Sequence, residues 1–169
     1  LFTKISEPQE KYKFIRKEEK TFIIEAGNHH IMEDLIFPAN SRVIVSSGTI
    51  LSFEENSSFI SRSPVIAIGS LNKPIIFTSK NKTWPGIFIT GSGSESVFEH
   101  VQISNTTGVG TGINPEGVNR SGWTLTGGAT FHKSPVKLKN CIIENSHAED
   151  ALNIFSTSFT IRNSIFKNT

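Results

Sequence analysis

The C-terminal part of this chain contains one pattern twice, and this repeat constrains the fold more than any other feature of the sequence. Residues 129–146 align without a gap on residues 152–169, at an offset of 23 positions. The matching positions are apolar residues and asparagines: Phe131 with Ile154, Val136 with Phe159, Leu138 with Ile161, Asn140 with Asn163, Ile142 with Ile165 and Asn145 with Asn168. A period of about 20–50 residues is typical of a solenoid, in which each repeat stacks on the next.

Each copy of the repeat contains three short runs in which apolar and polar residues alternate. In the first copy the apolar positions are Ala129 and Phe131, then Val136 and Leu138, then Cys141 and Ile143. A period of two indicates a strand with one buried face. The runs are too close together for helices between them, which excludes helical and leucine-rich repeats. We therefore predict an all-β chain that forms a parallel β-helix, or β-solenoid, with three strands in each coil.

The chain before the repeat adds further coils and one irregular segment. Residues 43–53, 59–77 and 86–105 follow the same alternation, which predicts about five coils in a single domain over residues 1–169. Residues 104–124 contain five glycines and no alternation. We expect a Gly-rich loop insertion there, because insertions in solenoid repeats lie in the turns.

The two ends of the chain carry different expectations. Residues 1–30 are expected to form a short N-terminal cap, in which residues 12–16 alternate like an edge strand; a short helix is the alternative. The last repeat copy has no polar cap, so the chain is expected to be a fragment of a longer solenoid. The open edge around residues 161–166 would either pair end to end with another copy or fray.

Several segments resemble the right-handed parallel β-helix proteins of the pectate-lyase-like superfamily. The resemblance is carried by VIVSSGTILSF (43–53), PIIFTS (74–79), WPGIFI (84–89) and the repeated pattern of residues 138–145. It implies a right-handed β-helix, a ladder of stacked amides at Asn140 and Asn163, and a secreted or cell-surface location. Because the superfamily includes lyases, hydrolases, epimerases, adhesins and phage tailspikes, the fold alone does not select a function.

Composition narrows the partners and places the aromatic residues. Seventeen Lys and Arg against fifteen Asp and Glu give a net charge of +2, so we expect no nucleic-acid partner. No apolar run reaches the roughly 18 residues that a membrane span needs, so we expect no membrane-spanning segment in this sequence. Cys141 occupies an apolar repeat position and is expected to be a small buried hydrophobe. Seven phenylalanines are expected to fill the core: Phe53, Phe59, Phe77, Phe98, Phe131, Phe159 and Phe166.

No catalytic signature of the superfamily is complete in this chain, so whether it is an enzyme stays open. The pectin hydrolases of that superfamily combine several aspartates with Gly-His and Arg-x-Lys elements, whereas here one acidic pair, Glu149 and Asp150, lacks those companions. The lyases combine acidic calcium ligands with a basic proton acceptor, and Arg162 has no second base beside it in the sequence. We expect no required cofactor, with calcium as the candidate ion.

The strongest polar cluster lies in the turn between the two repeat copies. Its members are His147, Glu149, Asp150 and Asn153. Carboxylates beside a histidine can perform acid–base chemistry or bind calcium, for which Glu149 and Asp150 are the candidate ligands. The alternative is a solvated turn whose aspartate bonds nearby backbone. The offset places Thr126 and Gly127 one coil below the carboxylates, and such small residues are expected to leave space for a ligand.

Two tryptophans complete the set of candidate ligand-binding residues. Trp84 precedes a Pro-Gly corner, and Trp123 ends the Gly-rich insertion. An outward indole can stack on the apolar face of a sugar ring, while the alternative is that each indole packs its own loop onto the coil.

Three function classes stay open at this point. The first is a secreted or surface module that binds, or is presented to, a polysaccharide or cell-surface glycan. The second is a non-enzymatic structural or adhesive stalk. The third is part of a polysaccharide lyase or hydrolase whose catalytic coils lie beyond residue 169, and the incomplete catalytic set argues against it for this chain alone.

Overall fold

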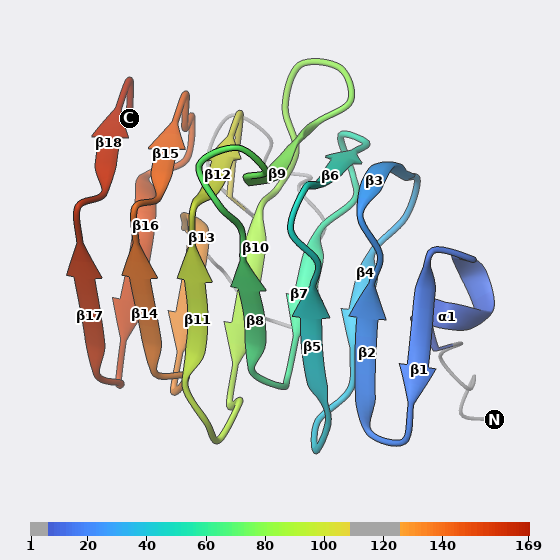
Figure 1. Cartoon of the computed structure of the whole chain (residues 1–169). Helices are drawn as coiled ribbons and strands as arrows, with labels where there is room; N and C mark the ends of the chain where they lie inside the picture. The colour runs from blue at the N-terminus through green and yellow to red at the C-terminus, as the bar shows by residue number, and fades with distance from the viewer. Residues whose placement is uncertain (1–6, 109–125) are drawn as a thin grey trace, which may run out of the picture.

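The computed structural model describes residues 7–108 and 126–169 and shows a parallel β-solenoid of about five turns. Strands stack into three sheets, here called A, B and C, and the chain visits them in that order in every turn. The strands of sheet A lie side by side along the solenoid, with β1 and β17 at its opposite ends (Figure 1). The all-β parallel fold expected from the repeat is therefore confirmed.

Each sheet contains one strand from each successive turn of the solenoid. Sheet A contains β1 (Ile15–Glu18), β2 (Thr21–Ile24), β5 (Arg42–Val45), β8 (Val65–Ile68), β11 (Ser96–Glu99), β14 (Val136–Lys139) and β17 (Phe159–Arg162). Sheet B contains β3 (Gly27–Ile31), β6 (Thr49–Phe53), β9 (Ile75–Ser79), β12 (Val101–Ser104), β15 (Ile142–Glu144) and β18 (Ile165–Lys167). Sheet C contains β4 (Leu35–Phe37), β7 (Phe59–Ser61), β10 (Ile87–Thr90), β13 (Gly127–His132) and β16 (Asp150–Phe155).

The strand register reproduces the 23-residue offset. Phe131 pairs with Ile154, and Leu138 pairs with Ile161, in adjacent parallel strands. Ile142 pairs with Ile165 in sheet B. A sequence offset becomes a spatial register because each turn of a solenoid adds one strand to each sheet, at the usual strand spacing of about 4.8 Å.

The core of the solenoid is a column of aromatic rings. Neighbouring rings have centroids 5.3–6.4 Å apart along the series Phe22, Phe37, Phe59, Phe77, Phe98 and Phe131, and the pairs are tilted or edge-to-face. Five of the seven phenylalanines expected inside are fully buried, whereas Phe159 and Phe166 are exposed, because they lie on β17 and β18, the outermost described strands of sheets A and B. On β15, Ile143 points into the core, as the alternation predicts, whereas its neighbour Ile142 is half-buried.

The corners between sheets use residues with left-handed backbone conformations. His100, Asn140 and Asn163 have φ of 50°, 54° and 48° at equivalent corners. Asparagine tolerates this region better than most residues, because its short amide can hydrogen-bond locally. The amide ladder expected at Asn140 and Asn163 is not seen there; an amide pair lies at the next corner, where Asn168 Nδ2 donates to Asn145 Oδ1 at 3.1 Å. The amide of Asn140 instead contacts His100 Nε2 at 3.2 Å.

The N-terminal cap combines the edge strand with the alternative helix. Helix α1 (Pro8–Lys11) precedes β1, which pairs antiparallel with β2 and covers the first coil. Tyr12 and Ile15 are buried beneath it, and Phe14 stacks on His29 with centroids 3.9 Å apart. The cap is shorter than the range 1–30 expected, because β2 and β3 already belong to the parallel sheets.

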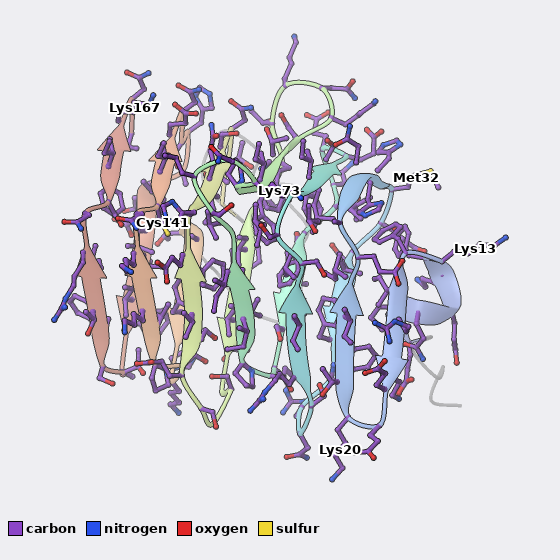
Figure 2. The ribbon with its side chains drawn as sticks, viewed as in Figure 1. Lys13, Lys20, Met32, Lys73, Cys141 and Lys167 are labelled. Carbon is purple, nitrogen blue, oxygen red and sulfur yellow. The ribbon has the colours of Figure 1, made fainter. Side chains whose placement is uncertain are left out.

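Cys141 is a buried thiol inside the body of the solenoid, whereas Lys20 points into solvent (Figure 2). Its Sγ–H donates to the Phe98 carbonyl oxygen at 3.3 Å, and burial raises its pKa. Folding therefore favours the neutral thiol over the thiolate. The stability that the buried neutral thiol contributes is complete below the ordinary thiol pKa and is lost as the pH rises through the raised pKa of the folded chain.

We expect a thiol-alkylating reagent at neutral pH to leave Cys141 unmodified in the folded chain and to modify it fully in denaturant. Thiolate is the reactive form, and the folded chain both buries the sulfur and keeps it protonated. Mass spectrometry of the intact chain over time provides the measurement. Equal labelling rates for folded and unfolded protein would contradict this burial.

Candidate functional site at the outer face of sheet C

Part of the predicted polar cluster forms a hydrogen-bonded group at the start of β16. Asp150 Oδ2 accepts hydrogen bonds from Thr126 Oγ1 at 3.2 Å and from Asn153 Nδ2 at 3.3 Å. Asn153 Nδ2 also donates to Thr126 Oγ1 at 3.3 Å. Gly127 pairs with Asp150 across adjacent strands, so the expected stacking of the 126–127 segment one coil below the carboxylates is confirmed.

The small residue at position 127 does not leave space for a ligand, contrary to expectation. Gly127 is buried, and a Cβ at this position would lie 2.7 Å from Thr130 Oγ1 and 2.8 Å from Asn153 Cβ. Position 127 therefore requires glycine, because β13 packs too closely against β16 to admit a side chain. Asp150 remains exposed at the rim of this contact, so a ligand would approach it from solvent.

The other two members of the predicted cluster are separate from this group. His147 and Glu149 are both exposed. His147 is anchored through its backbone N–H, which donates to the Thr106 carbonyl oxygen at 2.7 Å. The side-chain hydrogen bonds that organise the region connect Thr126, Asp150 and Asn153. The structure thus joins two of the four predicted residues and adds Thr126.

The hydrogen-bonded group of Thr126, Asp150 and Asn153 fits a polar organic ligand better than a cation. Within residues 7–108 and 126–169, no three His, Cys, Asp or Glu side chains gather where they could hold a metal ion. Calcium takes about 6–8 oxygen ligands. The Oδ2 atom of Asp150 already accepts two hydrogen bonds, and these donors would compete with a cation.

The expectation that Trp84 offers its indole to a sugar is wrong. Its side chain is fully buried and stacks on Phe53, with centroids 4.2 Å apart and an interplanar angle of 12°. The indole Nε1–H donates to the Ser104 carbonyl oxygen at 2.8 Å. The residue therefore packs a corner of the solenoid onto its core, which is the alternative interpretation of its position. Trp123 and most of the expected 104–124 insertion lie outside the described residues.

An aromatic pair on the outer face of sheet C is the feature that sequence reasoning missed. His132 on β13 and Phe155 on β16 stack with centroids 4.4 Å apart and an interplanar angle of 14°. Phe155 is 39% exposed and stands two residues beyond Asn153, on the same side of the strand. The offset of 23 residues already aligned these two positions, but it paired unlike residue types and so carried no obvious signal.

Neighbouring residues of sheet C hold the His132 ring in place and cover part of the outer face around the aromatic pair. Thr90 Oγ1 on β10 approaches His132 Nδ1 at 3.3 Å, so the histidine ring is held from the neighbouring coil. Phe88 and Thr130 are at outward positions of the same sheet, yet both are buried. At the β16 edge of this face, Asp150 and Phe155 are exposed and Asn153 is half-buried.

Comparisons with family models, curated proteins and solved structures found no match to this chain. Among the described residues, no helix is long and apolar enough to cross a membrane. The chain is a parallel β-solenoid that carries a strip of polar and aromatic side chains along β16.

Proposed function

We propose that this chain is a carbohydrate-binding module of a secreted or cell-surface protein, which holds a sugar on the strip formed by Asp150, Asn153 and Phe155. The observation that carries the proposal is the exposed Phe155 ring, stacked on His132 and in line with the Asn153 amide. Sugars present an apolar ring face and a rim of hydroxyl groups, so their recognition requires an aromatic surface beside hydrogen-bonding groups.

The spacing of the strip suits a sugar residue. Asn153 and Phe155 are two residues apart on one strand, which corresponds to about 7 Å along the sheet. A hexose ring is of this order of size, so one sugar can touch the phenyl face and still reach the amide. The Asp150 carboxylate is oriented by Thr126 and Asn153, and its second oxygen offers an acceptor for a sugar hydroxyl.

The likeness to pectate-lyase-like proteins supports the same class of ligand without supporting catalysis. The described residues place one oriented carboxylate at the strip, whereas glycoside hydrolysis ordinarily uses a pair of carboxyl groups about 5–10 Å apart. Binding is accordingly the function that we propose, and the enzyme assignment stays open.

We expect Phe155→Ala to weaken binding of the preferred oligosaccharide about tenfold or more. Loss of a stacked aromatic removes about 0.5–1.5 kcal/mol beyond the loss of buried area, and about 1.4 kcal/mol corresponds to a factor of ten in affinity. The ligand is first selected on a glycan array that includes neutral and acidic oligosaccharides. Calorimetry then gives the dissociation constant for each variant, with and without calcium.

A matched control uses an aromatic residue of similar exposure away from the strip. Phe166 is 41% exposed, and Phe166→Ala should leave the affinity unchanged. Asp150→Ala should weaken binding, and Glu149→Ala should not, because only the first of these carboxylates is held in the hydrogen-bonded group. An empty array, or equal affinities for all of these variants, would refute the proposal and favour the structural stalk.

A further inference from the structure

We propose that the outer face of sheet A is a docking surface for an acidic amphipathic helix of a partner protein. The surface belongs to a different sheet from the carbohydrate strip, so this proposal is independent of the proposed function. It is formed by β2, β5, β8, β11 and β14, each of which pairs with a strand on both sides. The surface therefore lies away from both edges of the sheet.

A row of four aliphatic side chains crosses the outer face of these strands. The row consists of register partners on successive strands: Ile23, Ile44, Ile66 and Val97. All four are half-buried, at positions that alternate with the buried core residues of the same strands. Ile68, two residues after Ile66 on the same face, is 49% exposed. The solvent face of a sheet is ordinarily polar, so a continuous aliphatic row indicates a surface that another element covers.

Ion pairs engage the acidic side chains beside this row. At the β1 end, Arg16 forms ion pairs with Glu18 and Glu25, which leaves one negative charge in excess there. At the other end, the Lys139 ammonium donates to Glu99 Oε1 at 2.7 Å, and this hydrogen bond lowers the pKa of Glu99. The Glu99 carboxylate is therefore ionised and neutralised within the sheet.

Two cations beside the row have no such partner. Arg42 is exposed two residues before Ile44 on β5, and Lys137 is the register partner of Val97 on β14. Neither forms an ion pair with any residue that the structure describes. The charge that a partner meets from β5 to β14 is therefore positive, and the complementary partner is acidic.

The spacing of the row selects a helix as the occupant. Neighbouring strands are about 4.8 Å apart, so four side chains in register span about 14 Å. The apolar positions i, i+3, i+7 and i+10 of an α-helix span about 15 Å along one stripe. Side chains on one face of an extended strand are about 6.6 Å apart, so a strand lying along the row would lose register after one or two residues. A helix lying across the four strands places one apolar side chain over each of them.

A model peptide tests the surface directly. The probe is a stapled helix of about 15 residues, with leucines at i, i+3, i+7 and i+10 and glutamates on both flanks. Calorimetry should show that it binds the parent chain more tightly than the same helix with lysines in place of the glutamates. The difference should shrink as added salt screens the charges. Equal affinities for the two helices would overturn the proposal.

Vesicles separate a helix from the other apolar and anionic partner, a lipid surface. The parent chain is sedimented with vesicles of phosphatidylcholine that contain phosphatidylserine. We expect no co-sedimentation, because the row is one side chain wide and the spacing argument requires a helix. Binding to the vesicles without binding to the acidic helix would overturn the proposal and assign the surface to a membrane.

One substitution in the row locates the binding on sheet A. Ile66→Asp should weaken binding of the acidic helix about tenfold or more, because it removes an apolar contact at the centre of the row and adds a like charge. Ile76→Asp is the matched control. Ile76 is also half-buried at an outward position, but on β9 of sheet B, so its variant should bind as the parent chain does.

A charge reversal keeps the test decisive if Ile66→Asp perturbs folding. Arg42 is exposed, and Arg42→Glu should weaken binding of the glutamate helix and strengthen binding of the lysine helix. Arg62→Glu, at an exposed position directly after β7 of sheet C, should change neither affinity. Affinities that are the same in Arg42→Glu and the parent chain would show that the helix binds elsewhere and would overturn the proposal.

Discussion

Phe98→Ala should lower the free energy of unfolding by about 3–5 kcal/mol, the range for truncating a buried aromatic side chain. Phe98 is fully buried on the inner face of β11 and packs between Phe77 and Phe131, with centroids 6.4 and 5.7 Å away. Its removal would leave a cavity inside a continuous column of rings, and stacked strands on all sides limit the collapse of that cavity. Chemical denaturation followed by circular dichroism gives the unfolding free energy.

Phe159→Ala is the matched substitution on the same inner face of sheet A. Phe159 is well exposed, so the change should cost about 1 kcal/mol, since only part of a phenyl ring leaves a buried environment. Equal losses for the two variants in the monomer would show that the last coil is covered in solution.

The fold was predictable because a solenoid converts sequence spacing into register. Phe131 above Ile154 and Leu138 above Ile161 follow from one number, the offset between repeat copies. The helix of the N-terminal cap was harder to foresee. Its four residues are too few to show periodicity, and only the capping contacts of Glu7 and Glu10 indicate it.

The candidate site was only partly predictable, for physical reasons that differ between residues. Asp150 and Asn153 could be found because they are polar residues at a corner of the repeat. The burial of Trp84 could not, because its ring rests on Phe53 and its N–H on the Ser104 carbonyl, which belong to different coils. The same holds for His132 and Phe155, whose importance arises from a contact between neighbouring strands.

Gly86→Ala should destabilise the chain by about 4 kcal/mol or more, a loss seen only where a substitution meets a specific structural obstacle. Gly86 precedes β10 and has a φ of +126°, a region that side chains rarely adopt. A Cβ there would lie 2.0 Å from the Gly128 carbonyl oxygen and 2.9 Å from its carbonyl carbon. Both obstacles are backbone atoms, so relief requires moving β10 away from β13.

Gly91→Ala separates this steric obstacle from the ordinary cost of replacing glycine at a positive φ. Gly91 follows β10 with a φ of +59°, and a methyl group added to it would meet no described atom within 4 Å beyond its chain neighbours. Its substitution should cost about 1–2 kcal/mol, the penalty for a left-handed residue that carries a Cβ. Denaturation of both variants beside the parent chain gives the comparison. Similar losses for Gly86→Ala and Gly91→Ala would mean that β10 and β13 separate at little cost.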